Sequence, residues 1–133
     1  MLTKIEIETK KETEIIDVAA RVEEIVKQSN VKEGVALVYV PHTACGIMLN
    51  EKTDPALKED LLRDLAMLFP TGDPRYKHRG GNADAHIKTA LVGSSVSIII
   101  ENRKLLLGQW QSAYLCEFDG PKTRQVYVKI LAG

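Results

Sequence analysis

The fold is decided by the stretch Val35-Ala36-Leu37-Val38-Tyr39-Val40, an unbroken apolar run. Gly34 precedes this run and Pro41 follows it, and a short apolar run between such residues indicates a buried β-strand. We expect the strand to be covered on both faces, because alternation with polar residues is missing. His42 follows Pro41 directly and is therefore predicted to lie where a rigid core strand ends.

A helix is predicted on each side of this strand. Upstream, Thr13 is expected to cap a helix that closes between Asn30 and Gly34. Its apolar face is predicted to contain Ile15, Val18, Ala19, Val22, Ile25 and Val26. Downstream, Asp54 and Pro55 have the residue types that begin helices, and this second helix is expected to end at Phe69. Its buried stripe is predicted to contain Leu57, Leu61, Leu65 and Leu68.

The rest of the chain is predicted to consist of short strands and one short helix. The strands are expected at 4–8, 47–49, 96–100, 105–107, 112–118 and 126–130, with turns at 101–104 and 119–121. In the last strand Val126, Val128 and Ile130 share one face. A third, shorter helix is expected to open at Asn82 and stop at Gly93. The fold class that follows is α+β, a single domain over 1–133 with largely antiparallel strands.

The composition limits the classes of function. Among 133 residues, 18 basic side chains balance 18 acidic ones, so the chain has no bulk charge that would favour nucleic acid or an anionic membrane. The longest apolar run is about six residues, too short to span a bilayer, and the first residues lack a signal-peptide core. Cys45 and Cys116 are isolated, which indicates reduced thiols rather than a disulfide framework. We therefore expect a cytoplasmic protein.

The three histidines are the candidate centre of any chemistry. His42 ends a strand, and His78 lies in a segment, 70–81, that has no periodicity and is long enough to act as a lid. His86 is predicted to share the inward stripe of the third helix with Ala83, Ile87 and Ala90. Three histidines can hold a divalent metal with one position left open, which suits zinc. The alternatives are that His42 caps its strand, that the loop has no task, and that His86 is a core histidine with ordinary partners.

Two further groups of residues stand out. Gly80 and Gly81 directly precede the predicted start of the third helix, where backbone N–H groups near Asn82 can bind an anion. Trp110, the only tryptophan, lies between Gln109 and Gln111. It is either a core residue or a wall on which a ligand stacks, in which case Gln111 and Glu117 are polar contacts to the ligand or to a metal-bound water.

Read together, these stretches resemble the YjbQ-like family, whose members are often described as secondary thiamine-phosphate synthases. The resemblance covers about residues 5–130. Its motifs are His42-Thr43 with Gly46, Asn50-Glu51, Tyr76 with His78, Ala85-His86-Ile87-Lys88, and Leu107-Gly108-Gln109-Trp110-Gln111 with Glu117. Three positions depart from the pattern: Ala44 replaces a hydroxyl residue, Cys45 replaces a small residue, and Gln109 replaces a threonine.

The resemblance implies a homotrimer and an activity that joins a hydroxymethylpyrimidine diphosphate to a thiazole phosphate. By position, His42, His78 and His86 become candidate metal ligands and, with Glu117, candidate catalytic residues. The remaining candidates are substrate contacts, namely Asn50, Glu51, Arg79, Asn82, Lys88, Trp110 and Gln111. Phosphorylated substrates favour cationic groups and magnesium. A metal-dependent hydrolase and a non-catalytic trimer that binds a metal or small ligand are the alternatives.

Overall fold

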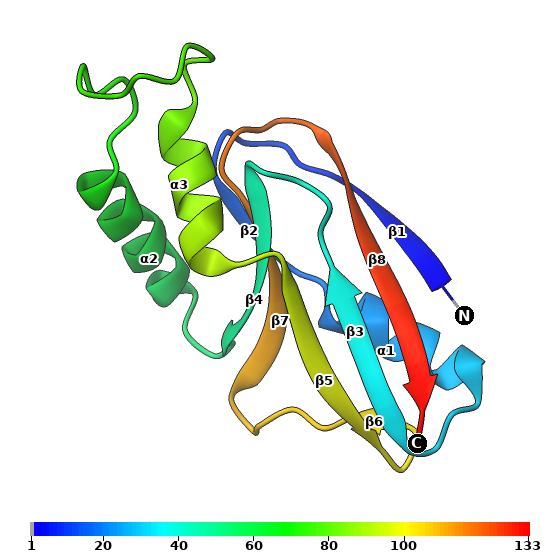
Figure 1. Ribbon diagram of the computed structural model, residues 1–133. Coiled ribbons are helices and arrows are strands. Elements are labelled where there is room, and N and C mark those ends of the chain that lie inside the picture. The colour runs from blue at the N-terminus through cyan, green and yellow to red at the C-terminus, as the bar shows by residue number, and fades with distance from the viewer. Residues whose placement is uncertain (1) are drawn as a thin grey trace.

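A computed structural model describes residues 2–133, and it contains two antiparallel sheets and three helices (Figure 1). In chain order the elements are β1 (Leu2–Glu8), β2 (Glu14–Asp17), α1 (Ala19–Ser29), β3 (Gly34–Tyr39), β4 (Cys45–Glu51), α2 (Pro55–Leu68), α3 (Ala83–Val92), β5 (Ser95–Glu101), β6 (Lys104–Leu105), β7 (Gln111–Glu117) and β8 (Thr123–Ala132). The larger sheet has the strand order β1-β8-β3-β5-β6 and the smaller has the order β2-β7-β4. The predicted α+β class is confirmed.

The elements form three layers. The main core lies between the inner face of the larger sheet and a layer made of α1 and the smaller sheet; Val128, Val26 and Ile47 represent its three sources. A second, smaller core around Ala85, Cys116 and Phe118 lies on the opposite face of the smaller sheet. The helices α2 and α3 cover that face, and Figure 1 shows them on the side of the molecule away from the larger sheet. The smaller sheet thus contributes to both cores.

Local signals in the sequence placed several elements correctly. The Asp54 side chain accepts a hydrogen bond from the Ala56 N–H and caps α2, with Pro55 at its first position. Val126, Val128 and Ile130 all face the main core, as their alternation predicted. The segment 70–81 contains no helix or strand, as expected.

The start of the first helix was predicted wrongly. Glu14–Asp17 is the strand β2, and α1 begins only at Ala19. Ile15 and Ile16 lie opposite Cys116 and Leu115 of β7. This pairing completes the smaller sheet and overrides the helical spacing. The Asp17 carboxylate, not Thr13, accepts the N–H of Ala19 at 2.9 Å.

Three predictions about buried faces were also wrong. The helix α2 has no fully buried residue, and Leu57 and Leu68 are 38% and 69% exposed. The buried face of α3 contains Asp84, Ala85, Lys88 and Thr89 instead of the stripe that includes His86. The strand β3 is covered on one face only, because Tyr39 is 46% exposed on the other. The strand expected at 105–107 is limited to Lys104–Leu105.

Candidate functional site

Two of the three histidines meet in a pocket beside the start of α3. The rings of His78 and His86 are 5.1 Å apart between centroids and stand edge to face. With Thr43, Tyr76 and Lys77 they line a pocket of about 580 Å³, which Ala83 and Ile87 complete. We call this the histidine pocket. Its volume lies in the range of small-molecule sites.

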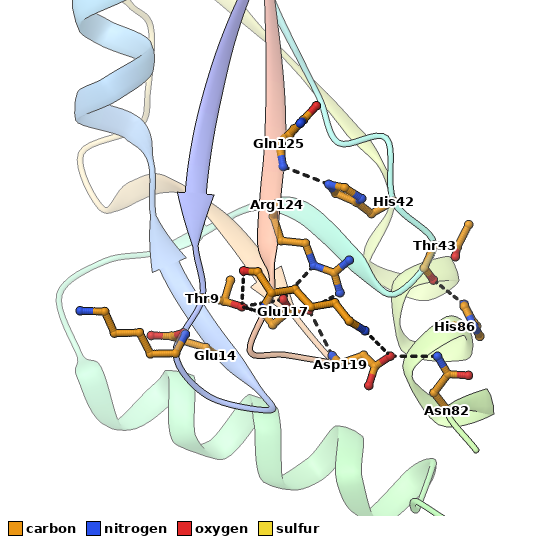
Figure 2. A network of polar contacts seen from close by, with 12 residues as sticks. Thr9, Glu14, His42, Thr43, Asn82, His86, Glu117, Asp119, Arg124 and Gln125 are labelled. Atoms are coloured by element: carbon orange, nitrogen blue, oxygen red, sulfur yellow. Dashed lines mark hydrogen bonds and ion pairs between the residues drawn. The ribbon is translucent and has the colours of Figure 1, made fainter. Parts of the chain in front are cut away.

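Hydrogen bonds fix which nitrogen of each ring is open. The carbonyl oxygen of Thr43 lies 2.9 Å from Nδ1 of His86. Because a carbonyl only accepts, Nδ1 must carry the proton, and Nε2 of a neutral His86 is left as a bare acceptor. Figure 2 shows this bond between α3 and the segment before β4. His86 therefore presents a group that can accept or deliver a proton.

The orientation of His78 depends on a chain of polar contacts. Burial alone raises the pKa of Asp119, but hydrogen bonds from Lys122 and Asn82 outweigh it and hold the pKa below its usual range. The ionised carboxylate accepts the Asn82 Nδ2–H at 2.9 Å, so Oδ1 of Asn82 turns toward His78. His78 Nε2 lies 3.0 Å from that oxygen and must donate to it, which leaves Nδ1 open.

His42 is held differently. Its Nε2 accepts the backbone N–H of Gln125 in β8 at 3.0 Å (Figure 2). Burial, followed by the positive charge of Arg124, lowers the pKa of His42, while Glu117 acts in the opposite direction. The ring is therefore neutral near pH 7 with its proton on Nδ1.

These bonds bear on the predicted zinc site. Within 2–133 no group of three or more His, Cys, Asp or Glu side chains is placed to hold a metal ion. The Nε2 lone pair of His42 is already used by Gln125. The three histidines thus do not fit a shared metal in this conformation, and metal binding by them stays a prediction.

Glu117 is fully buried at the end of the main core and pairs with Arg124. Its carboxylate accepts Arg124 Nε and Nη2 at 2.8 and 2.7 Å and the Thr9 hydroxyl at 2.8 Å. Burial by itself raises the pKa of Glu117, but these bonds and the Asp119 N–H lower it overall. The arrangement is that of a structural ion pair behind His42.

Four predicted substrate contacts lie at the far end of β4, away from the histidine pocket. Asn50, Glu51, Trp110 and Gln111 line a separate pocket of about 380 Å³. Trp110 is 59% exposed, so it is not a core residue. Glu51 accepts the N–H groups of Thr53 and Asp54 before α2, and the hydrogen bonds from Thr53 and then Asp54 lower its pKa.

The remaining two cationic candidates differ in exposure. Lys88 is 3% exposed, and its Nζ donates to the buried Asp84 carboxylate at 2.9 Å. Its ammonium group is therefore engaged and does not line the histidine pocket. Arg79 is exposed in the loop before α3.

Sequence reasoning missed Arg124, Asp119 and Lys77. Arg124 has the same strand parity as Val126, Val128 and Ile130, so an inward-facing charge was detectable from the alternation that predicted the core. Asp119 was recognised only as part of a turn. No pattern in the sequence signals its contact with Asn82, which is 37 residues away.

The fold and the pocket define a small α+β protein with a histidine-lined cavity beside the start of α3. A family model described as "UPF0047 protein YjbQ-like" matches residues 3–133. A UPF0047 protein of Methanocaldococcus jannaschii is 46% identical over 98% of this chain and 94% of its own. The UPF0047 protein YugU of Bacillus subtilis is 43% identical over 98% of this chain and 99% of its own.

Solved structures agree with these sequence relatives. A YjbQ/UPF0047 protein from Clostridium acetobutylicum superposes with a TM-score of 0.93 at 47% identity, covering 97% of this chain and 99% of its own. A protein of unknown function from Sulfolobus solfataricus gives a TM-score of 0.95 at 31% identity, covering 100% and 97%. The chain belongs to the YjbQ-like UPF0047 family.

Proposed function

We propose that this chain is an enzyme that acts on phosphorylated small molecules, with a reaction of the thiamine-phosphate synthase type. The observation that carries the proposal is the bond from His86 Nδ1–H to the Thr43 carbonyl, which leaves Nε2 open in a pocket that Lys77 also lines. A cationic side chain beside a histidine suits a substrate that carries phosphate. The family resemblance supplies the substrate class.

The reaction sets the task of these side chains. The C–O bond between the pyrimidine methylene and the diphosphate breaks, and its electron pair leaves with pyrophosphate. The lone pair of the thiazole nitrogen forms the new C–N bond. No proton has to move at the reacting carbon or nitrogen, so the protein must hold both substrates and stabilise the leaving charge. Lys77 and a protonated His86 Nε2 would donate to that charge.

A hydrolase is the second candidate. The bare Nε2 of neutral His86 can take a proton from water, which would then attack the same diphosphate. Binding without catalysis is the third candidate. The two reactions differ in whether thiazole phosphate is required for loss of the diphosphate.

A divalent metal is part of the proposal. Zinc at the three histidines would require His42 to release the Gln125 N–H. Magnesium carried by the diphosphate requires no such change, and the geometry favours it. When bound, such an ion would offset the negative charge of the leaving pyrophosphate.

Self-association as a homotrimer in the cytoplasm completes the proposal. The outer face of the larger sheet has an apolar groove of about 610 Å³ between β1, β3 and β8. Leu2, Tyr39 and Leu131 in this groove are 60%, 46% and 48% exposed, and a second copy would cover them. Light scattering should give three times the chain mass, and Leu131→Glu should lower the measured mass.

Two observations bear on the proposed compartment. Within the described chain, no helix has the length and apolarity needed to cross a bilayer. Both cysteines are free, in line with a reducing compartment.

The activity is tested with hydroxymethylpyrimidine diphosphate, thiazole phosphate and Mg²⁺. We expect thiamine phosphate to form with the wild-type protein and EDTA to suppress it. His86→Asn keeps a donor toward the Thr43 carbonyl but removes Nε2, and we expect about a hundredfold loss of rate. Arg63→Met, at an exposed position of α2, is the control and should keep the wild-type rate.

The same assay separates the candidates. Loss of diphosphate without thiazole phosphate would favour the hydrolase. Wild-type rates in the His86→Asn variant, with the fold intact, would refute the role of the histidine pocket. No turnover of either kind would refute the enzyme proposal and leave the binding protein.

A further inference from the structure

A second cavity adjoins the histidine pocket at His86, and neither proposed reaction uses it. Its volume is about 250 Å³. Its walls come from α3, the residues after this helix and the segment before β4, and they are His42, Thr43, His86, Thr89, Ala90, Gly93 and Ser94. Thr43 and His86 also line the histidine pocket. We call this second space the Thr89 cavity.

Thr89 gives the cavity a polar group that lacks a partner. The residue is 4% exposed, and its hydroxyl oxygen is buried without a hydrogen bond among residues 2–133. A buried hydroxyl in this state costs free energy, and valine would fill nearly the same volume without that cost. The oxygen has almost no accessible surface, so a molecule in the cavity would accept this hydroxyl after a rotation of the Thr89 side chain toward it.

Apart from His86, which both cavities share, the other polar groups of the cavity carry no formal charge when His42 is neutral. His42 has its proton on Nδ1 because Nε2 accepts from Gln125, and burial and Arg124 lower its pKa. Ser94 adds a second hydroxyl, and Ala90 and Gly93 add apolar surface. The histidine pocket differs, because Lys77 brings a positive charge to it. The two cavities therefore select for different chemical groups.

We propose that the Thr89 cavity binds the uncharged heteroaromatic ring of a substrate whose phosphorylated end lies in the histidine pocket. A ring nitrogen would accept the Thr89 hydroxyl or the His42 N–H, and the volume admits a single small ring. The bond between ring and diphosphate would then lie beside His86, which both cavities share. This inference rests on the proposed function and assigns the orientation of its pyrimidine substrate.

The test uses the uncharged hydroxymethylpyrimidine alcohol as the probe, followed by ¹⁵N NMR of the full chain. We expect saturable shifts at the backbone amides of Thr89, Ala90, Gly93 and Ser94. Inorganic pyrophosphate should instead shift the amides of Lys77 and His78. Shifts of the alcohol that lie outside the Thr89 cavity, or no saturable shift, would overturn the proposal.

Two variants of Thr89 test the role of the hydroxyl. Thr89→Val should weaken binding of the alcohol about fivefold, the effect of one neutral hydrogen bond. It should melt no lower than the wild type, because it removes an unsatisfied buried group. Thr89→Ser keeps the hydroxyl and should bind within about twofold of the wild type. Unchanged binding in Thr89→Val together with a lower melting temperature would mean that the hydroxyl is structural, and the proposal would fail.

The outcome is independent of catalysis. If the alcohol shifts the Thr89 cavity but no thiamine phosphate forms, the ring subsite stands and the proposed reaction fails. If thiamine phosphate forms while the alcohol leaves these amides unchanged, the reaction stands and the subsite fails.

Discussion

Arg124→Met offers a quantitative test of the ion pair behind His42. The substitution keeps an unbranched side chain but removes the guanidinium that donates two hydrogen bonds to Glu117, at 2.8 and 2.7 Å. Glu117 is 0% exposed, so its carboxylate would stay buried without a counter-charge. Breaking a buried pair in this way costs about 3–5 kcal/mol of unfolding free energy. For a chain of 133 residues this corresponds to roughly 11–18 °C in melting temperature.

The destabilisation caused by Arg124→Met should depend on pH, in a direction that the pKa of Glu117 determines. In the wild type the folded-state pKa of Glu117 is lowered, so its stabilising contribution is present above the unfolded pKa and is lost as pH falls through the folded value. In Arg124→Met, burial acts with less opposition and should raise the pKa of Glu117. The cost of the substitution should therefore be smaller at pH 5 than at pH 7, because protonation removes the buried charge.

Urea unfolding, monitored by circular dichroism at pH 5 and pH 7, measures the loss of unfolding free energy and its dependence on pH. Glu117→Gln combined with Arg124→Met should be more stable than Arg124→Met alone, because the uncompensated charge is absent. Arg63→Met, which breaks an exposed pair with Asp60, is the control and should cost under about 1 kcal/mol. The reasoning is wrong if Arg124→Met costs no more than this control, or if its cost is the same at both pH values.

Three further predictions concern other parts of the molecule. Burial raises the pKa of Cys45 and Cys116 to about 12, so neither thiol should react with Ellman's reagent at pH 8 until the protein is unfolded; fast reaction in the native state would contradict this. Asn82→Ala should free Nε2 of His78 from its acceptor, and ¹⁵N NMR of the ring should show a mixture of tautomers in place of one. Gly34→Ala should destabilise the fold by about 1–3 kcal/mol, because its Cβ would overlap the Leu131 carbonyl oxygen; a melting temperature equal to the wild type would exclude that overlap.

Local rules predicted the elements whose determinants are close together in the sequence. Asp54 and Pro55 fix the start of α2 through bonds within two residues, and β8 shows its buried face by alternation alone. The strand β2 escaped prediction because Ile15 and Ile16 depend on partners about 100 residues away. Helical spacing of apolar residues does not predict a helix reliably when the same residues can pair with the edge of a strand distant in the sequence.

The candidate site was predictable in its members but not in its division. The motifs placed the three histidines in one metal or catalytic site with Trp110 as a substrate contact. In the fold His86 shares one cavity with His78 and another with His42, while Trp110 lines a separate pocket. Which ring nitrogen is open depends on the Thr43 carbonyl, the Asn82 amide and the Gln125 N–H, and these are backbone or long-range contacts. A sequence pattern does not carry that information.

The position of the single tryptophan has a practical consequence for anyone who studies this protein by spectroscopy. The backbone of Trp110 bonds to Lys52, just past the last residue of β4, while Thr43 precedes the first residue of that strand. Seven residues of extended chain separate the two ends by roughly 20 Å. Tryptophan fluorescence will thus report on solvent around the indole and will not change when a molecule enters beside the imidazoles, so a flat tryptophan titration curve would be no sign of an empty protein.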